Sequence, residues 1–194
     1  MKRIILISMV FLISHIGFAQ EVLEWNPKYK LRLSDFQSSS TQIGGVSIIQ
    51  LQNGAQMDFS YQMSNLEFAL RKNFNSFAKC VFHTDIATIV ANDSATANDL
   101  VLFAQYQYDL TELYTRKFRK ALFEEKGFFS STSFFQPIYD RINRELSVRM
   151  TEANKNMGMD KEKLAELHQD VIEELASFSE YCFRCKAVKR KKKK

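Results

Sequence analysis

Four ionisable side chains with the spacing of one helix face lie between residues 98 and 122, which read NDLVLFAQYQYDLTELYTRKFRKAL. They are Asp109, Glu112, Arg116 and Arg119, separated by three, four and three positions. A helix advances about 100° per residue, so the four groups share one side, and Glu112 and Arg116 form a favourable i, i+4 ion pair. The ordinary interpretation is a solvated, ion-paired surface. The alternative is a buried network that braces the helix.

Histidines are the next candidates for chemistry. Only His83 and His168 follow residue 19. Each fits a histidine that makes a single hydrogen bond, and their spacing specifies no metal site. Together with a carboxylate they could in principle bind a metal, so relocated metal ligands stay an alternative.

Three cysteines, Cys80, Cys182 and Cys185, leave one thiol over in an oxidising compartment. Cys182 and Cys185 can form a local disulfide, or one of them can reach Cys80. A redox Cys-x-x-Cys pair normally precedes a helix whose N-terminus lowers a thiol pKa, whereas this pair follows a predicted helix. Redox catalysis is therefore disfavoured, and a zinc half-site fails because the chain has no second pair.

The segment that carries the charged face is predicted to be a long helix. Thr96 and Asp99 fit a capping pair at its start, and Gly127 stands where a C′ glycine would end it. The first half is apolar on nearly every side, which is typical of a buried helix. The second half is amphipathic.

The run FAQYQYDLTELYTRKFRKAL also resembles the signature helix of a bacterial secreted family, domain of unknown function 922, whose members are regarded as zinc-dependent proteases. That signature reads His-Glu-Gln-x-His-Phe-Asp-Ile-x-Glu, followed by Tyr-x-Arg-Lys-x-Arg. The identical positions here are Gln105, Asp109, Glu112, Tyr114, Arg116, Lys117 and Arg119. The differences fall on the chemistry, because Phe103 replaces the first His, Ala104 the Glu and Gln107 the second His.

These three replacements remove the parts of a His-Glu-x-x-His zinc site. Such a site binds zinc through two imidazoles one turn apart, and its Glu acts as general base on the zinc-bound water. Phe103 has no lone pair, Ala104 accepts no proton, and Gln107 offers only a neutral amide. The resemblance therefore implies a degenerate metallopeptidase scaffold, for which we expect no catalytic residues, no metal and no cofactor.

The two ends of the chain predict export and a basic tail. Residues 1–19 are typical of a secretory signal, with two basic residues before an apolar run, so we expect its removal and a periplasmic or extracellular location. Residues 186–194 carry seven positive charges and are predicted to be disordered by self-repulsion. Without these seven and the two at the start, the net charge of +5 becomes −4 for residues 20–185.

The N-terminal third of the remaining chain is predicted to be extended. Leu31, Leu33 and Phe36 alternate with polar residues, as in a half-buried strand. The pair Asn53-Gly54 predicts a hairpin turn between two flanking strands.

Helices dominate the rest of the chain. Residues 80–90 predict a strand ahead of the central helix, and the four phenylalanines within 128–135 predict a segment pinned into the core or, if exposed, a partner site. Two further helices are predicted, one from Pro137 and one over 161–182. The sequence thus predicts one α+β domain over residues 20–185, with an N-terminal antiparallel sheet, a long central helix and two further helices. The resemblance implies a zincin-like layout.

These observations lead to one principal hypothesis and two alternatives. The principal hypothesis is an exported, non-catalytic binding or structural module with a protein or envelope partner. The first alternative is a metal-dependent peptidase or hydrolase whose ligands have moved to His83 or His168. The second is attachment to an anionic envelope surface through residues 186–194. Export argues against a nucleic-acid partner.

Overall fold

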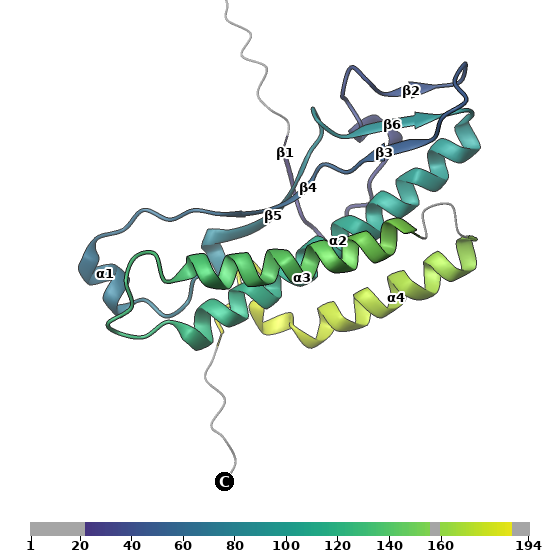
Figure 1. The fold of residues 1–194 in the computed structure, drawn as a ribbon. Helices are drawn as coiled ribbons and strands as arrows, with labels where there is room; N and C mark the ends of the chain where they lie inside the picture. Colours follow the sequence, from purple (N-terminus) through teal and green to yellow (C-terminus); the bar gives the residue numbers. More distant parts are fainter. Residues whose placement is uncertain (1–21, 156–159, 188–194) are drawn as a thin grey trace, which may run out of the picture.

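A computed structural model describes residues 22–155 and 160–187 (Figure 1). The predicted signal sequence and residues 188–194 of the basic tail lie outside these described residues. The α+β class is confirmed, because two small sheets lie against helices that are arranged around one long helix. No helix within the described ranges is long and apolar enough to cross a bilayer.

The strands form two three-stranded sheets instead of the single antiparallel sheet that was predicted. They are β1 (Val22–Glu24), β2 (Gln42–Ile43), β3 (Gln50–Gln52), β4 (Ala55–Phe59), β5 (Ala78–His83) and β6 (Thr88–Ala91). In the first sheet β5 lies between β1 and β4, and both pairings are antiparallel. In the second sheet β6 lies between β2, which runs parallel to it, and β3, which runs antiparallel.

The hairpin predicted at Asn53-Gly54 is wrong, because the strands on either side of these residues join different sheets. Asn53 directs its side-chain amide to helix α2 (Ser94–Glu125), where it donates to the carbonyl oxygen of Ala104 (3.3 Å). A Cβ added at Gly54 would lie 2.3 Å from the carbonyl oxygen of His83. Glycine is therefore required here for the close approach of two backbones, not for a turn.

Helix α2 lies at the centre of the molecule and has 32 residues, which corresponds to about 48 Å. Its N-cap is Asp93, whose carboxylate accepts a hydrogen bond from the backbone N–H of Thr96 (2.7 Å), so the cap lies earlier than predicted. At the other end Lys126 is the C-cap, and Gly127 does not adopt the positive φ of a C′ glycine. The sheets and two helices cover α2 along most of its length (Figure 1), so its second half is buried as well as its first.

Two further helices follow α2, as predicted. Helix α3 (Phe135–Lys155) and helix α4 (Lys161–Ser177) both pack against α2. Asp160 caps α4, because its carboxylate accepts a hydrogen bond from the backbone N–H of Lys163 (3.0 Å). The short helix α1 (Asn65–Leu70) lies at the end of the molecule where α2 and α3 are connected (Figure 1).

The strand predicted around Leu33 is wrong, and a 3-10 turn over Leu33–Asp35 takes its place. The carboxylate of Asp35 accepts hydrogen bonds from the hydroxyl of Tyr29 (2.9 Å) and from the backbone N–H of Arg32 (2.7 Å). These local bonds close a turn and compete with the extended backbone that the alternating pattern indicated.

Two clusters of buried side chains surround α2. The first is rich in aromatic rings and joins α2 to α1, α3 and α4, and the second lies between α2 and the sheets. The segment with four phenylalanines is divided between core and surface. Phe134 and Phe135 pack against the first cluster, whereas Phe128 and Phe129 are exposed. The core prediction therefore holds for the second half of that segment only.

Candidate functional site

The three positions where the metallopeptidase signature has its His, Glu and His serve packing in this chain. Phe103 belongs to the first core cluster and stacks on Tyr106, with 6.1 Å between the ring centroids. Ala104 is completely buried in the second cluster. One turn of α2 thus contributes to both cores, which an ionised Glu at position 104 would disrupt unless it were paired.

Gln107 is held by hydrogen bonds at both ends of its side-chain amide. Its Oε1 accepts from Asn53 Nδ2 (2.8 Å), and its Nε2 donates to Asn154 Oδ1 (2.6 Å). Asn53 lies between β3 and β4, and Asn154 lies near the end of α3. This amide chain joins a sheet, the central helix and α3. The side chain at the position of the second His therefore bridges three elements through structural hydrogen bonds, and it offers only a neutral amide oxygen, which is a poor metal ligand.

The charged face of α2 is buried, so its interpretation as a solvated surface is wrong. The side chains of Glu112 and Arg119 are only 3% and 1% exposed. Glu112 Oε1 accepts from Arg116 Nε (2.8 Å) and from Arg119 Nη1 (2.9 Å). The face is buried because α4, the 3-10 turn Ser179–Tyr181 and β5 cover it. The alternative of a bracing network describes what the structure shows.

The two arginines bind backbone carbonyl groups of the elements that cover them. Arg119 donates through Nε (3.0 Å) and Nη2 (2.8 Å) to Ala78 O, at the start of β5, and through Nη1 (3.0 Å) to Tyr181 O. Arg116 Nη1 donates to Leu175 O (2.9 Å) in the last turn of α4. Cations are favourable at a helix C-terminus, where carbonyl groups lack intrahelical partners. The network thus fixes α2 to β5 and to the end of α4.

Asp109 joins a second group of elements one turn earlier on α2. Its carboxylate accepts from the indole N–H of Trp25 (2.7 Å) and from Gln105 Nε2 (3.0 Å), and it lies 2.7 Å from His168 Nε2 on α4. A carboxylate only accepts, so the histidine donates in this contact. Burial by itself raises the pKa of Asp109, but the hydrogen bonds from His168, Gln105 and Trp25 outweigh it and leave the pKa below its usual value.

The contact between His168 and Asp109 has the geometry of a base and the group that orients it in nucleophilic catalysis. A pocket of about 350 Å³ lies beside His168, between α2 and α4. Its described lining is mostly apolar, with two lysines, and holds no serine, threonine or cysteine. The arrangement therefore supplies a histidine and its carboxylate but no nucleophile for acyl transfer.

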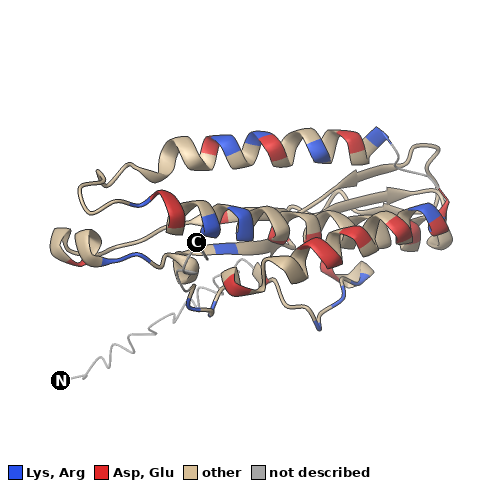
Figure 2. Cartoon of the chain, turned by 90° about the horizontal axis from the view of Figure 1, so that it is seen from below, with Lys and Arg blue, Asp and Glu red and all other residues tan. Residues whose placement is uncertain are grey.

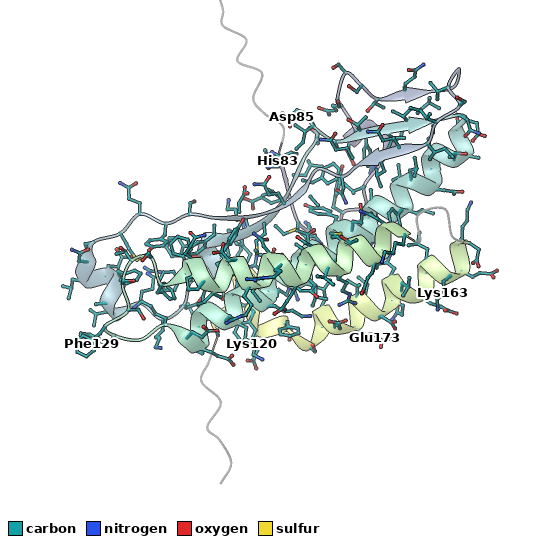
Figure 3. The ribbon with its side chains drawn as sticks, viewed as in Figure 1. His83, Asp85, Lys120, Phe129, Lys163 and Glu173 are labelled. Atoms are coloured by element: carbon teal, nitrogen blue, oxygen red, sulfur yellow. A yellow bond between two sulfur atoms is a disulfide. The ribbon has the colours of Figure 1, made fainter. Side chains whose placement is uncertain are left out.

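His83 and His168 do not form a common site. His83 pairs with Val22 at the end of β5, whereas His168 contacts Asp109 from α4. Figure 3 shows His83 beside the sheets, and it places Lys163 and Glu173, which flank His168 on α4, on the other side of α2. The described residues contain no group of three His, Cys, Asp or Glu side chains suited to a metal ion. Nothing in the described arrangement favours relocated ligands.

A pocket of about 440 Å³ opens beside the Glu112 network. The rings of Trp25 and Phe183 form part of its lining, and a cation lies near each ring. Arg116 Cζ is 5.2 Å from the centre of the Trp25 ring, and Lys79 Nζ is 5.3 Å from that of Phe183. The charged side chains of the lining are Glu24, Lys79, Glu112, Arg116, Arg119 and Arg184. Positive charges therefore exceed negative ones in this pocket, which we call the Trp25 pocket.

The segment that holds Phe183 over the pocket is closed by a disulfide between Cys182 and Cys185. The carbonyl oxygen of Cys185 accepts hydrogen bonds from Asn73 Nδ2 (3.1 Å) and Asn75 Nδ2 (3.0 Å). Cys80 also lines the pocket but is buried, and burial raises the pKa of its thiol well above the ordinary value. A protonated thiol is a poor nucleophile, so Cys80 serves as a small apolar side chain.

These contacts differ in how far they can be predicted from the sequence. Trp25 is the only tryptophan, which singles it out, but its bond to Asp109 spans 84 positions. The sequence predicts a turn at Asn53, and nothing in the sequence around Asn154 predicts its contact. Both are amide side chains whose role depends on a partner that is distant along the chain.

No protein-family model, no curated protein and no solved structure matches this chain. The resemblance to domain of unknown function 922 therefore stays a prediction. Any function has to be argued from the described side chains themselves.

Proposed function

We propose that this chain is an exported, non-catalytic binding protein on a degenerate metallopeptidase-like scaffold, and that it binds a small anionic ligand in the Trp25 pocket. The observation that carries the non-catalytic part is the amide chain through Gln107, which engages both ends of that side chain. The amide of Gln107 is engaged in structural hydrogen bonds to Asn53 and Asn154, and a neutral amide is a poor metal ligand and no general base. Phe103 and Ala104 have no group that could bind a metal or act as a base.

The charge of the Trp25 pocket supports the anionic ligand. Arg119 has all its nitrogen atoms engaged by protein acceptors, whereas Arg116 uses Nε and Nη1 only. Arg116 Nη2 makes no hydrogen bond to the residues that the structure describes. The guanidinium plane of Arg116 is fixed by Glu112, Leu175 and the ring of Trp25. A fixed guanidinium with a spare donor suits a carboxylate or phosphate, and the aromatic rings suit an unsaturated or aryl group next to it.

The non-catalytic part is tested by elemental mass spectrometry and a protease assay. The chain from Gln20 to Lys194 is purified without a metal-binding tag, and its zinc content and its cleavage of casein are measured. We expect much less than one zinc per chain and no cleavage. Close to one zinc per chain together with cleavage would overturn the proposal. Sequencing the N-terminus of the exported protein tests removal of residues 1–19, and retention of that segment would contradict export by this route.

The binding part is tested with the fluorescence of Trp25, which is the only tryptophan and lines the pocket. Phenyl phosphate and benzoate are titrated, with benzyl alcohol as the neutral control. We expect a saturable change for the two anions only. Arg184→Gln should weaken it by about five- to tenfold, as loss of one nearby charge implies. The matched control is Lys163→Gln, an exposed lysine on α4 away from this pocket. Equal responses to anions and benzyl alcohol would contradict an anion site.

A further inference from the structure

A short loop closed by a disulfide forms one wall of the Trp25 pocket. The bond joins Cys182 to Cys185, and we call residues 182–185 the disulfide loop. Cys182, Phe183 and Arg184 all belong to the described lining of the pocket. The redox state of this loop therefore bears directly on the shape and the charge of the proposed ligand site.

The disulfide loop supplies an aromatic ring and a positive charge to the pocket. The ring of Phe183 lies near two cations, with Lys79 Nζ 5.3 Å and Arg119 Cζ 6.0 Å from its centre. Arg184 is exposed and adds a further cation to the lining. Acidic positions prevail along α4 (Figure 2), so positive charge is not spread evenly over the described surface. An anion in the pocket would meet a ring and a cation that both come from the disulfide loop.

The two ends of the disulfide loop are held by hydrogen bonds that do not need the disulfide. Before the loop, the carbonyl oxygen of Tyr181 accepts from Arg119 Nη1 (3.0 Å). At its end, the carbonyl oxygen of Cys185 accepts from Asn73 Nδ2 (3.1 Å) and Asn75 Nδ2 (3.0 Å). These anchors should therefore remain when the disulfide is reduced.

The middle of the disulfide loop depends on the covalent bond. One backbone hydrogen bond crosses the loop, from the N–H of Cys185 to the carbonyl oxygen of Cys182 (3.0 Å). The cation contacts of Phe183 are weak where water has access. Without the disulfide, the turn that carries Phe183 and Arg184 is closed by a single hydrogen bond and gains conformational freedom. We expect both side chains to leave their positions over the pocket.

The disulfide is accessible from the pocket. Cys182 and Cys185 are both half-buried, whereas the free thiol of Cys80 belongs to a side chain that is 3% exposed. Cys182 lines the pocket, and Cys185 is not among the described lining residues. The volume of about 440 Å³ is large enough for a small thiol. A thiolate that enters the pocket therefore meets Cys182 before Cys185.

We propose that reduction of the Cys182–Cys185 disulfide by a dithiol lowers the affinity of the Trp25 pocket for its anionic ligand. One thiolate of the dithiol attacks Cys182 Sγ, and the electron pair of the broken S–S bond moves to Cys185 Sγ, which takes a proton from water. The second thiolate of the dithiol then displaces Cys182 Sγ from the mixed disulfide, and this sulfur is protonated in turn. The protein gains two electrons and two protons, and the dithiol leaves as a cyclic disulfide.

This regulation rests on the anion site proposed above, and it acts in both directions. A ligand that binds the oxidised chain more tightly than the reduced chain must favour the disulfide by the same factor. The fold is kept in both states, because the anchors from Arg119, Asn73 and Asn75 remain and a loop this short contributes little to stability. The change is therefore confined to the wall of the pocket.

The first test is a titration with phenyl phosphate, followed by the fluorescence of Trp25, before and after reduction with dithiothreitol. The chain without residues 1–19 is used, and a thiol count confirms its state, since the oxidised form has one free thiol and the reduced form three. We expect the reduced chain to bind about tenfold more weakly, because reduction affects both the ring of Phe183 and the charge of Arg184.

The matched control is Cys182→Ser/Cys185→Ser, which cannot form the disulfide. It should show the weaker affinity both with and without dithiothreitol, and its circular dichroism should match that of the unmodified chain. Equal affinity of the oxidised and reduced chains would overturn the regulation and leave the anion site standing. An oxidised chain that binds no anion would overturn both.

Hydrogen–deuterium exchange without ligand tests the release of the loop separately. We expect reduction to speed exchange in peptides that cover residues 179–187 and to leave α2 protected. Unchanged exchange in these peptides, or faster exchange throughout the described fold, would overturn a local release.

The closing experiment measures the reverse effect in a dithiol redox buffer. Alkylation and mass spectrometry give the ratio of reduced to oxidised chain with and without saturating phenyl phosphate. We expect the ligand to lower this ratio by about tenfold, equal to the difference in affinity. Benzyl alcohol, the neutral control, should leave the ratio unchanged. A ratio that phenyl phosphate does not alter would overturn the proposal.

Discussion

Substituting Glu112 with glutamine tests the bracing network with the smallest change of shape. The side chain of Glu112 is 3% exposed and is the only carboxylate that the described structure pairs with Arg116 and Arg119. Glutamine keeps the size and one acceptor oxygen but removes the charge. The amide nitrogen of the glutamine is a hydrogen-bond donor and would face the N–H groups of a guanidinium, which are donors as well. Two buried guanidinium groups would be left without their counter-charge.

The expected loss can be estimated from the burial of the partners. Removing one member of a buried ion pair costs about 3–5 kcal/mol, because the remaining charge is neither paired nor solvated. The side chain of Arg119 is only 1% exposed, so this range applies to it. Arg116, at 10% side-chain exposure and next to the Trp25 pocket, can be partly solvated and limits the loss. The free energy of unfolding of a whole domain is only about 5–15 kcal/mol, so the variant should be severely destabilised.

Urea denaturation followed by circular dichroism measures this loss, since urea does not screen ion pairs as guanidinium chloride does. The matched control is Glu174→Gln. Glu174 pairs with Lys117 (3.2 Å) and Arg149 (2.8 Å), but its side chain is 38% exposed, so we expect less than about 1 kcal/mol. A loss for Glu112→Gln below about 1 kcal/mol, or equal to that of the control, would refute the view that this network braces α2.

Three further predictions concern other contacts. Gly54→Ala should lower the free energy of unfolding by about 3 kcal/mol, because the added Cβ would lie 2.3 Å from a backbone carbonyl oxygen. The control is Gly127→Ala, whose added Cβ would have its nearest atom at 3.5 Å, and thermal unfolding of this variant should be close to that of the unmodified chain. Reducing the Cys182–Cys185 disulfide should cost no more than about 2 kcal/mol, because the loop it closes is short, and unfolding under reductant would contradict this. Asp109 has a lowered pKa, so its stabilising contribution is present at neutral pH and is lost as the pH falls through the folded-state pKa. Asp109→Asn should therefore flatten the decrease in stability on the acid side of about pH 4, and an unchanged acid profile would contradict that role.

The central helix and the absence of metal ligands at Phe103, Ala104 and Gln107 could be read from the sequence, because neither depends on residues distant along the chain. The apolar first half of α2 and the two helices after it were predicted from periodicity, and the structure has them. The chemistry of Phe103, Ala104 and Gln107 is a property of the residue types alone. It needs no structure to exclude two imidazole ligands and a carboxylate base.

The sheets could not be derived in the same way, because strand pairing is decided by distant partners. Asn53-Gly54 is a strong local turn signal, yet Asn53 is bound by α2 and Gly54 is packed against the backbone of His83. The alternating pattern around Leu33 predicts a strand, but the side chain of Asp35 accepts a hydrogen bond from the backbone of Arg32 and closes a turn instead. Local propensity was overridden in both places by a single hydrogen-bonded side chain.

The sequence by itself determined the class of fold, the central helix, the lack of imidazole or carboxylate groups at positions 103, 104 and 107, and the concentration of positive charge in residues 186–194. Only the tertiary structure decided whether the charged face of α2 meets water or protein. Periodicity places Glu112 and Arg119 on one side of a helix, but burial depends on what packs there, and β5 and the end of α4 do so. The same holds for Phe129, because its exposure depends on the anchoring of Phe134 and Phe135 nearby in the core. Free energy of burial depends on area removed from water, and that area is a property of the assembled fold.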